Sequence, residues 1–136
     1  MTMLMHMRHG PVVLVTRDAG MDALVTSALA NLGSQAPRLS SVASMTECVA
    51  AVQLLHPSVV LLDDAVADRP GAPLLQALQA VQPGVRVVYI ASNHSLDLER
   101  ELRRQGVLFY VARPVESETL EATLIAILTG LLRSSV

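Results

Sequence analysis

The sequence predicts an α/β domain in which helices cover both faces of a parallel β-sheet. Three observations support this fold class. Hydrophobic residues make up 51% of the 136 residues and charged residues 16%, which suits one globular core. Short apolar runs alternate with segments of helical periodicity, and this alternation favours parallel strands joined by right-handed crossovers. The runs have no polar face, as in strands that are buried on both sides.

Five strands and five helices are expected along the chain. The clearest strand covers residues 59–62 and ends in two adjacent carboxylates, Asp63 and Asp64. A weaker strand over 38–43 alternates polar and apolar residues, as strands at a sheet edge do. Residues 1–10 are expected to form a flexible extension and residues 11–136 the domain. The other strands are predicted at 11–16, 85–92 and 107–112, and the helices at 21–32, 45–56, 72–82, 95–106 and from about 116 onward.

Composition also limits the function. The net charge is −2 and the chain has no Lys, so it has no basic field that would attract nucleic acid. The single cysteine, Cys48, is expected to be a small buried hydrophobic residue in a reducing cytoplasm. The first residues lack the apolar run of a signal peptide, and the most apolar segment, 123–132, is shorter than the ~20 residues that span a bilayer. We therefore expect a cytoplasmic domain that binds neither nucleic acid nor membrane.

A site is expected at the carboxyl ends of the strands, where parallel sheets of this kind bind ligands and carry out reactions. The four histidines, His6, His9, His56 and His94, are scattered along the chain and suggest no metal cluster. The candidate pocket consists of the residues that follow the strands: Thr16, Arg17 and Asp18 after the first, Asp63 and Asp64 after the third, Ala91 and Ser92 after the fourth, and Arg113 with Pro114 after the fifth.

Two segments carry a resemblance to a known family. PSVVLLDDAVADRPG (57–71) resembles the phospho-acceptor region of bacterial response-regulator receiver domains. GVLFYVARPVESETL (106–120) resembles the last strand, the cis-prolyl turn and the last helix of the same family, and the likeness covers about residues 11–128. The resemblance implies the flavodoxin-like or CheY-like fold, a three-layer sandwich with five helices and a five-stranded parallel sheet of order 2-1-3-4-5.

The resemblance also implies roles for single residues. Asp63 stands at the position that accepts a phosphoryl group from a sensor histidine kinase, and Tyr110 stands at the aromatic switch position. Ala91 occupies the position of the family's switch Ser or Thr, although the neighbouring Ser92 would replace that hydroxyl in part. Arg113 occupies the position of the family's Lys, whose charge it keeps with a different geometry.

The end of the first strand departs from the family pattern. Receivers end this strand with two acidic residues that bind a divalent metal, whereas Thr16 and Arg17 stand at those positions here. A guanidinium has donors but no acceptor, so Arg17 cannot be a metal ligand. Asp18 is expected to be a helix N-terminal carboxylate rather than a ligand. We predict that Arg17, or failing that Arg113, lies within salt-bridge distance of Asp63.

These departures leave three functions open. The favoured one is an atypical, degenerate receiver that is not an enzyme and acts through protein–protein interaction without phosphorylation. In the second, Asp63 is a working phospho-acceptor, and only then is Mg²⁺ expected, with Asp18 and Asp63 as weak candidate ligands. Asp64 is expected to be solvated or to cap the following loop. The third is a flavodoxin-like cofactor binder, which the missing Gly-rich loop and the few aromatics disfavour.

The final helix predicts an association surface. Leu120, Leu124 and Ile127 lie on one helical stripe with Leu128 and Leu131, which the sheet can bury. The resemblance implies a histidine kinase or a downstream output protein as the partner, and the apolar surface of the helix predicts a homodimer. Ile125 and Leu132 fall outside that stripe and extend the apolar surface sideways. The resemblance implies a dimer face formed by the fourth helix, the fifth strand and the fifth helix. The predicted interface there consists of Ile125, Leu132, Arg100, Arg103, Arg104 and Glu121.

Overall fold

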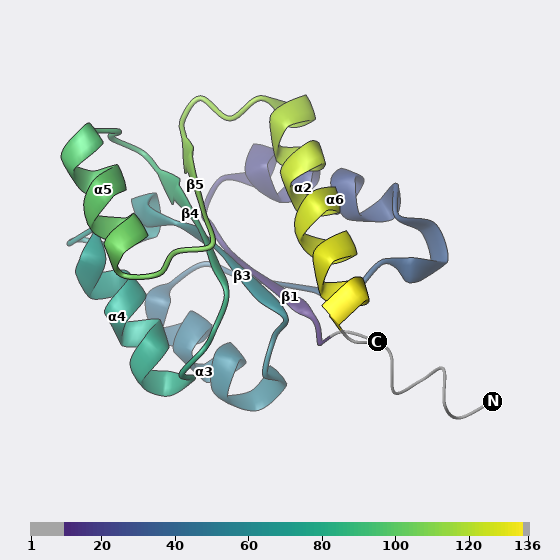
Figure 1. The fold of residues 1–136 in the computed structure, drawn as a ribbon, viewed down its shortest axis with the longest axis horizontal. Helices are drawn as coiled ribbons and strands as arrows, with labels where there is room; N and C mark the ends of the chain where they lie inside the picture. Colours follow the sequence, from purple (N-terminus) through teal and green to yellow (C-terminus); the bar gives the residue numbers. More distant parts are fainter. Residues whose placement is uncertain (1–9, 135–136) are drawn as a thin grey trace.

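A parallel five-stranded sheet lies between two layers of helices in the computed structural model, which describes residues 10–134 (Figure 1). The strand order β2-β1-β3-β4-β5 confirms the predicted fold. The strands are β1 Val12–Val15, β2 Leu39–Val42, β3 Val59–Asp63, β4 Val87–Ala91 and β5 Phe109–Ala112. The helices are α2 Ala19–Ala30, α3 Met45–Leu55, α4 Ala72–Val81, α5 Leu96–Arg104 and α6 Ser117–Ser134, with 3-10 turns η1 Gly33–Gln35 and η2 Asp64–Val66.

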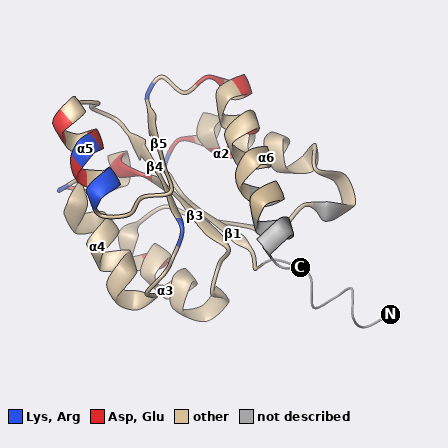
Figure 2. Ribbon diagram, in the orientation of Figure 1, with Lys and Arg blue, Asp and Glu red and all other residues tan. Residues whose placement is uncertain are grey.

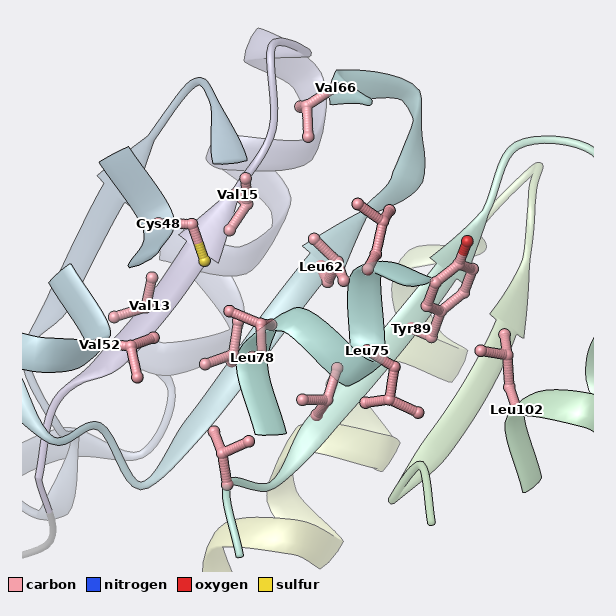
Figure 3. Packing of buried hydrophobic residues seen from close by; sticks show 14 of the residues in the cluster. Val13, Val15, Cys48, Val52, Leu62, Val66, Leu75, Leu78, Tyr89 and Leu102 are labelled. Atoms are coloured by element: carbon pink, nitrogen blue, oxygen red, sulfur yellow. The ribbon is translucent and has the colours of Figure 1, made fainter. Parts of the chain in front are cut away.

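The three central strands are buried along their whole length, as their apolar sequences predict. Successive side chains of a strand point to opposite faces of the sheet, so each strand contributes to two cores. Val12 and Leu14 pack in the layer of α2 and α6. Val13 and Val15 pack in the layer of α3, α4 and α5, which Figure 3 shows from close by. The weak strand, β2, lies at the edge of the sheet as expected.

Polar residues cap the helices that begin at the carboxyl edge of the sheet. Ser44 and Ser95 accept backbone hydrogen bonds at the starts of α3 and α5. Gly71 precedes α4 with a φ of 108°, a backbone conformation that favours glycine. The helical segments therefore begin where the strands end, around the predicted site.

Cys48, on α3, is fully buried as predicted, and burial raises the pKa of its thiol to about 11.

The last helix buries the predicted stripe against the sheet. Leu120, Leu124 and Ile127 lie in the core, whereas the Ile125 side chain is 38% exposed. The side chains predicted at Leu128, Leu131 and Leu132 lie outside the described part of the structure, as do residues 1–9 and 135–136. Across residues 10–134, no helix combines the length and the apolar character that crossing a membrane requires.

Candidate functional site

The carboxyl ends of β1, β3, β4 and β5 bring the predicted pocket residues together. Parallel pairing aligns Val15 with Leu62 and Asp63 with Ile90, so the residues that follow these strands meet at one edge. Three carboxylates and one guanidinium lie there among hydroxyl and backbone groups. The site contains two separate hydrogen-bond networks, one around Asp63 and one around Asp64.

Asp63 is 1% exposed and has hydrogen-bond partners on both oxygens. Its Oδ2 accepts from Thr16 Oγ1 at 2.7 Å and from Arg113 Nη2 at 2.5 Å. Its Oδ1 accepts from the backbone N–H of Ala65 at 3.1 Å. A buried carboxylate of this kind persists when a cation and hydrogen bonds compensate the loss of water. The strand end therefore holds an ion pair whose charge is already balanced.

Arg113 joins two carboxylates. Its Nη1 donates to Asp18 Oδ2 at 3.1 Å while Nη2 donates to Asp63. Asp18 also caps α2, because its Oδ1 accepts from the backbone N–H groups of Gly20 and Met21. The hydrogen bond from Arg113, with those from the backbone of Met21 and Gly20, lowers the pKa of Asp18 below its ordinary value. The prediction of a helix N-terminal carboxylate at Asp18 is confirmed.

The predicted pairing of Arg17 with Asp63 is wrong, and the alternative pairing with Arg113 is confirmed. Arg17 is exposed, and its Nε donates to the carbonyl of Ala43 at 3.0 Å. The reason is local geometry, because successive side chains of an extended segment point in opposite directions. Thr16 points toward Asp63, so Arg17 points away from it. Arg113 reaches Asp63 from the end of β5, just before the cis peptide bond to Pro114.

Of the two roles expected for Asp64, the solvated one is wrong, whereas the loop-capping one is confirmed for the turn after β4. Asp64 is 3% exposed, and its Oδ1 accepts from the backbone N–H of Ser92 at 2.8 Å. Its Oδ2 accepts from the hydroxyl of Tyr89, also at 2.8 Å. Tyr89 was not among the predicted site residues. The signal that points to it is one polar hydroxyl within the otherwise apolar run of β4, because a buried hydroxyl needs a hydrogen-bond partner.

Tyr110 lies beside Tyr89 on the neighbouring strand. The two residues are partners in the β4–β5 register, and their rings are parallel within 1° with centroids 6.2 Å apart. The Tyr110 hydroxyl lies 2.9 Å from His94 Nδ1 in the turn between β4 and α5. Burial raises the pKa of both tyrosines, and for Tyr89 the hydrogen bond to Asp64 raises it further. The predicted switch position is therefore stacked and hydrogen-bonded.

The donor set does not fit a divalent cation. Receiver-type metal binding needs oxygen ligands that are free to turn toward the ion. Asp18 and Asp63 are both bonded to the Arg113 guanidinium, and the Thr16 hydroxyl donates to Asp63. Within residues 10–134 no group of three or more His, Cys, Asp or Glu side chains is arranged to hold a metal. Ala91, buried at the end of β4, supplies no hydroxyl.

The predicted interface residues lie on different surfaces. On α5, Arg103 pairs with Glu99 at 2.8 Å and Arg104 pairs with Glu101, and Arg100 is exposed. On α6, Glu121 accepts from Asn31 Nδ2 at 3.0 Å, at the end of α2. Helices α5 and α6 cover opposite faces of the sheet (Figure 1), and Figure 2 shows the mixed charges of α5.

This separation corrects the predicted composite patch. Ile125 follows Glu121 by one helical turn, so both lie on the flank of α6 nearest α2. Helical periodicity identified Ile125 as lying outside the buried stripe, but it does not say which neighbouring helix that flank faces. The predicted contribution of Leu132 lies outside the described side chains.

Comparisons with known proteins agree with the fold. No protein-family model matches the sequence. The regulatory protein LuxO of Vibrio vulnificus is 26% identical over 110 residues, which cover 81% of this chain and 24% of LuxO. The transcriptional regulatory protein CitB of Klebsiella pneumoniae is 29% identical over 73 residues, covering 54% of this chain and 31% of CitB. The matched region makes up 24% of the length of these LuxO proteins, so the chain spans about a quarter of each.

Solved structures match most of the chain. The signal receiver domain of a putative Luxo repressor protein from Vibrio parahaemolyticus superposes with a TM-score of 0.77 and 16% identity, covering 90% of this chain and 92% of that one. A CheY-like response regulator receiver domain protein from Methanospirillum hungatei gives a TM-score of 0.76 and 18% identity, covering 93% of this chain and 98% of that one. At these identities the structural likeness establishes the fold.

Proposed function

We propose that the chain is an atypical response-regulator receiver that acts through protein–protein contacts without phosphorylation of Asp63. Its sequence similarity to LuxO regulatory proteins and its CheY-like receiver fold support this proposal. In this proposal the domain is a signalling module in the cytoplasm, has no catalytic activity of its own and uses no cofactor. We do not propose the third function, that of a flavodoxin-like cofactor binder.

The contact between Arg113 and Asp63 carries the proposal. Phosphoryl transfer to a carboxylate depends on an accessible oxygen and on a cation that neutralises the incoming group. Here Asp63 Oδ2 already accepts from Thr16 and Arg113, and Arg113 is bonded to Asp18 as well. At ~4 Å and an effective dielectric of ~20, one such ion pair amounts to about 4 kcal/mol before desolvation. Releasing the oxygen therefore requires breaking its ion pair with Arg113 and its hydrogen bond from Thr16.

A second function, a working phospho-acceptor, has one observation in its favour. Asp63 is retained at the end of the buried strand, and Arg113 keeps a quarter of its side-chain surface exposed, at 26%. A guanidinium that turns outward would leave Asp63 and Asp18 facing a common space. This alternative predicts that phosphoryl analogues bind only when Arg113 has moved.

Beryllofluoride, a mimic of the phosphoryl group, separates the two functions. With Mg²⁺ and beryllofluoride, the proposal predicts no bound fluorine resonance in the ¹⁹F NMR spectrum. A stoichiometric bound resonance that disappears in the Asp63→Asn variant would establish the second function instead. As a positive control, Thr16→Asp places a second carboxylate beside Asp63 and is expected to raise the affinity for Mg²⁺ measured by calorimetry.

The proposed partners are a sensor histidine kinase or a downstream output protein, and a second copy of the chain. The exposed Ile125 on the α2 side of α6 is the apolar residue proposed to contact the second copy. Light scattering at high concentration should show a dimer that Ile125→Glu dissociates. Leu54→Glu is the matched control, because Leu54 is 80% exposed on α3, on the other face of the sheet. A monomer for the unsubstituted protein would contradict self-association.

A further inference from the structure

We infer that Asp64 is a positioning residue that, through the hydroxyl of Tyr89, sets the place of the Tyr110 ring and of the turn between β4 and α5. In this way a buried carboxylate shapes the surface at this edge of the domain. None of the contacts that link Asp64 to Tyr110 and to this turn involves Asp63. Three sets of contacts support the inference.

The first set surrounds the carboxylate. Asp64 is 3% exposed, and each of its oxygens accepts one hydrogen bond, from Ser92 N and from the Tyr89 hydroxyl. No cationic group of residues 10–134 lies within salt-bridge distance of it. A buried carboxylate without a cation is stabilised by its hydrogen bonds alone, so those two donors are held firmly in place.

The second set fixes the Tyr89 hydroxyl from two sides. The hydroxyl donates to Asp64 Oδ2 at 2.8 Å and accepts from the backbone N–H of Gly71 at 2.7 Å. A phenol has one proton to donate, so its direction follows the acceptor. Tyr89 is fully buried between α4 and α5, close to Leu75 and Leu102 (Figure 3). The ring position is thus tied to Asp64 at one end of the side chain and to the packed core along its length.

The third set reaches the surface. Tyr110 stacks on Tyr89, and its hydroxyl lies 2.9 Å from His94 Nδ1. His94 belongs to the turn between β4 and α5, and so does Ser92, whose backbone N–H donates to Asp64. Asp64 therefore holds this turn directly through Ser92 and indirectly through the two tyrosines. Tyr110 is partly exposed and His94 is exposed, so this chain of contacts ends at the surface.

Asp63 provides a matched control within the same chain. It is also a buried carboxylate, but its donors are Thr16, Ala65 and Arg113, and it shares none of them with Asp64. The two networks can therefore be disturbed separately. None of the hydrogen bonds of Asp64 involves Asp63 or its donors, so the inference can fail while the proposed function stands.

The composition makes a direct test feasible, because the chain has two tyrosines and no tryptophan. Protein labelled with 3-fluorotyrosine should give two ¹⁹F resonances, assigned with Tyr89→Phe and Tyr110→Phe. Asp64→Asn is expected to move both. Ser92 and Tyr89 donate to different oxygens of Asp64, and in Asn one of these oxygens is replaced by an NH2 group that cannot accept. Asp63→Asn is expected to leave the Tyr110 resonance at its original position.

Two measurements complete the test. If Asp64→Asn does not fold, Tyr89→Phe removes only the linking hydroxyl and is expected to shift the remaining Tyr110 resonance. Backbone hydrogen exchange in residues 92–95 should be faster in Asp64→Asn or Tyr89→Phe than in Asp63→Asn. An unmoved Tyr110 resonance in a folded Asp64→Asn or Tyr89→Phe protein would overturn the inference, and so would an equal shift in Asp63→Asn.

Discussion

Arg113 Nη2 lies 2.5 Å from Asp63 Oδ2, so the cation that balances the buried carboxylate comes from the end of β5. The two residues are 50 positions apart in the sequence. Arg17, only two positions after Val15 at the end of β1, instead bonds to the backbone of Ala43. The cation that pairs with Asp63 therefore comes from the strand that is far away in the sequence, and not from the nearer Arg17.

Removing the Arg113 guanidinium should destabilise the fold. Arg113→Ala leaves Asp63 buried without a cation, and we expect the free energy of unfolding to fall by about 3 kcal/mol, the lower end for a broken buried pair because Arg113 is partly exposed. Urea-induced unfolding followed by circular dichroism measures this. Arg17→Ala is the control and should change it by no more than about 0.5 kcal/mol. Equal losses in both variants would contradict the assignment of the ion pair.

Removing the Tyr89 hydroxyl should also destabilise the fold. Tyr89→Phe leaves Asp64 Oδ2 and the N–H of Gly71 without their partner, and an unsatisfied buried group costs about 1–3 kcal/mol. We therefore expect a loss of about 2 kcal/mol in the free energy of unfolding. Tyr110→Phe, which removes a hydroxyl bonded to the exposed His94, should cost less than about 1 kcal/mol. The reverse order would show that the Tyr89 hydroxyl is not held as described.

Stability should fall at alkaline pH. The pKa of Tyr89 is raised by burial and by Asp64, and that of Tyr110 is raised by burial, so the folded state keeps these protons longer than the unfolded state. The contribution is fully present below the ordinary pKa of 10.0 and is lost as the pH rises above it. The slope should reach about 1.4 kcal/mol per pH unit for Tyr89.

The alkaline experiment needs a background without the thiol. Cys48, whose pKa rises from 9.0 to about 11, gives a dependence of the same sign from a lower pH. Urea unfolding is therefore compared in Cys48→Ala and in Cys48→Ala with Tyr89→Phe. The second protein should lose less stability between neutral pH and about pH 11. Identical slopes would argue against a raised pKa at Tyr89.

Asp18 should stabilise the fold more by capping α2 than by its ion pair with Arg113. Asp18→Ala removes the acceptor for the N–H groups of Gly20 and Met21 and should lower the free energy of unfolding by about 1 kcal/mol. Asp18→Ser keeps a capping oxygen and loses the ion pair with Arg113, so it should recover most of that loss. Thermal unfolding of the three proteins at neutral pH measures the difference. No recovery in Asp18→Ser would mean that the ion pair dominates.

Much of the fold was predictable from the sequence because the apolar pattern is strong. The runs that became β1, β3 and β4 have no polar face, and strands of this kind are stable only between two layers of helices. The same pattern placed Asp63 and Arg113 at the ends of their strands. Since parallel strands end at one edge, the two were expected to be close, and they are.

The sequence by itself thus determined the order of the elements, their buried faces and most of the residues at the site, but not Tyr89. The tertiary structure decided which of those residues meet. Arg113 reaches Asp63 while Arg17 turns away, and Asp64 turns inward to Tyr89 rather than to solvent. Periodicity reports the face of a strand or helix on which a residue lies, but contacts between elements depend on side-chain direction and reach across the packed sheet. The direction and the reach of each side chain are fixed only when the strands have paired.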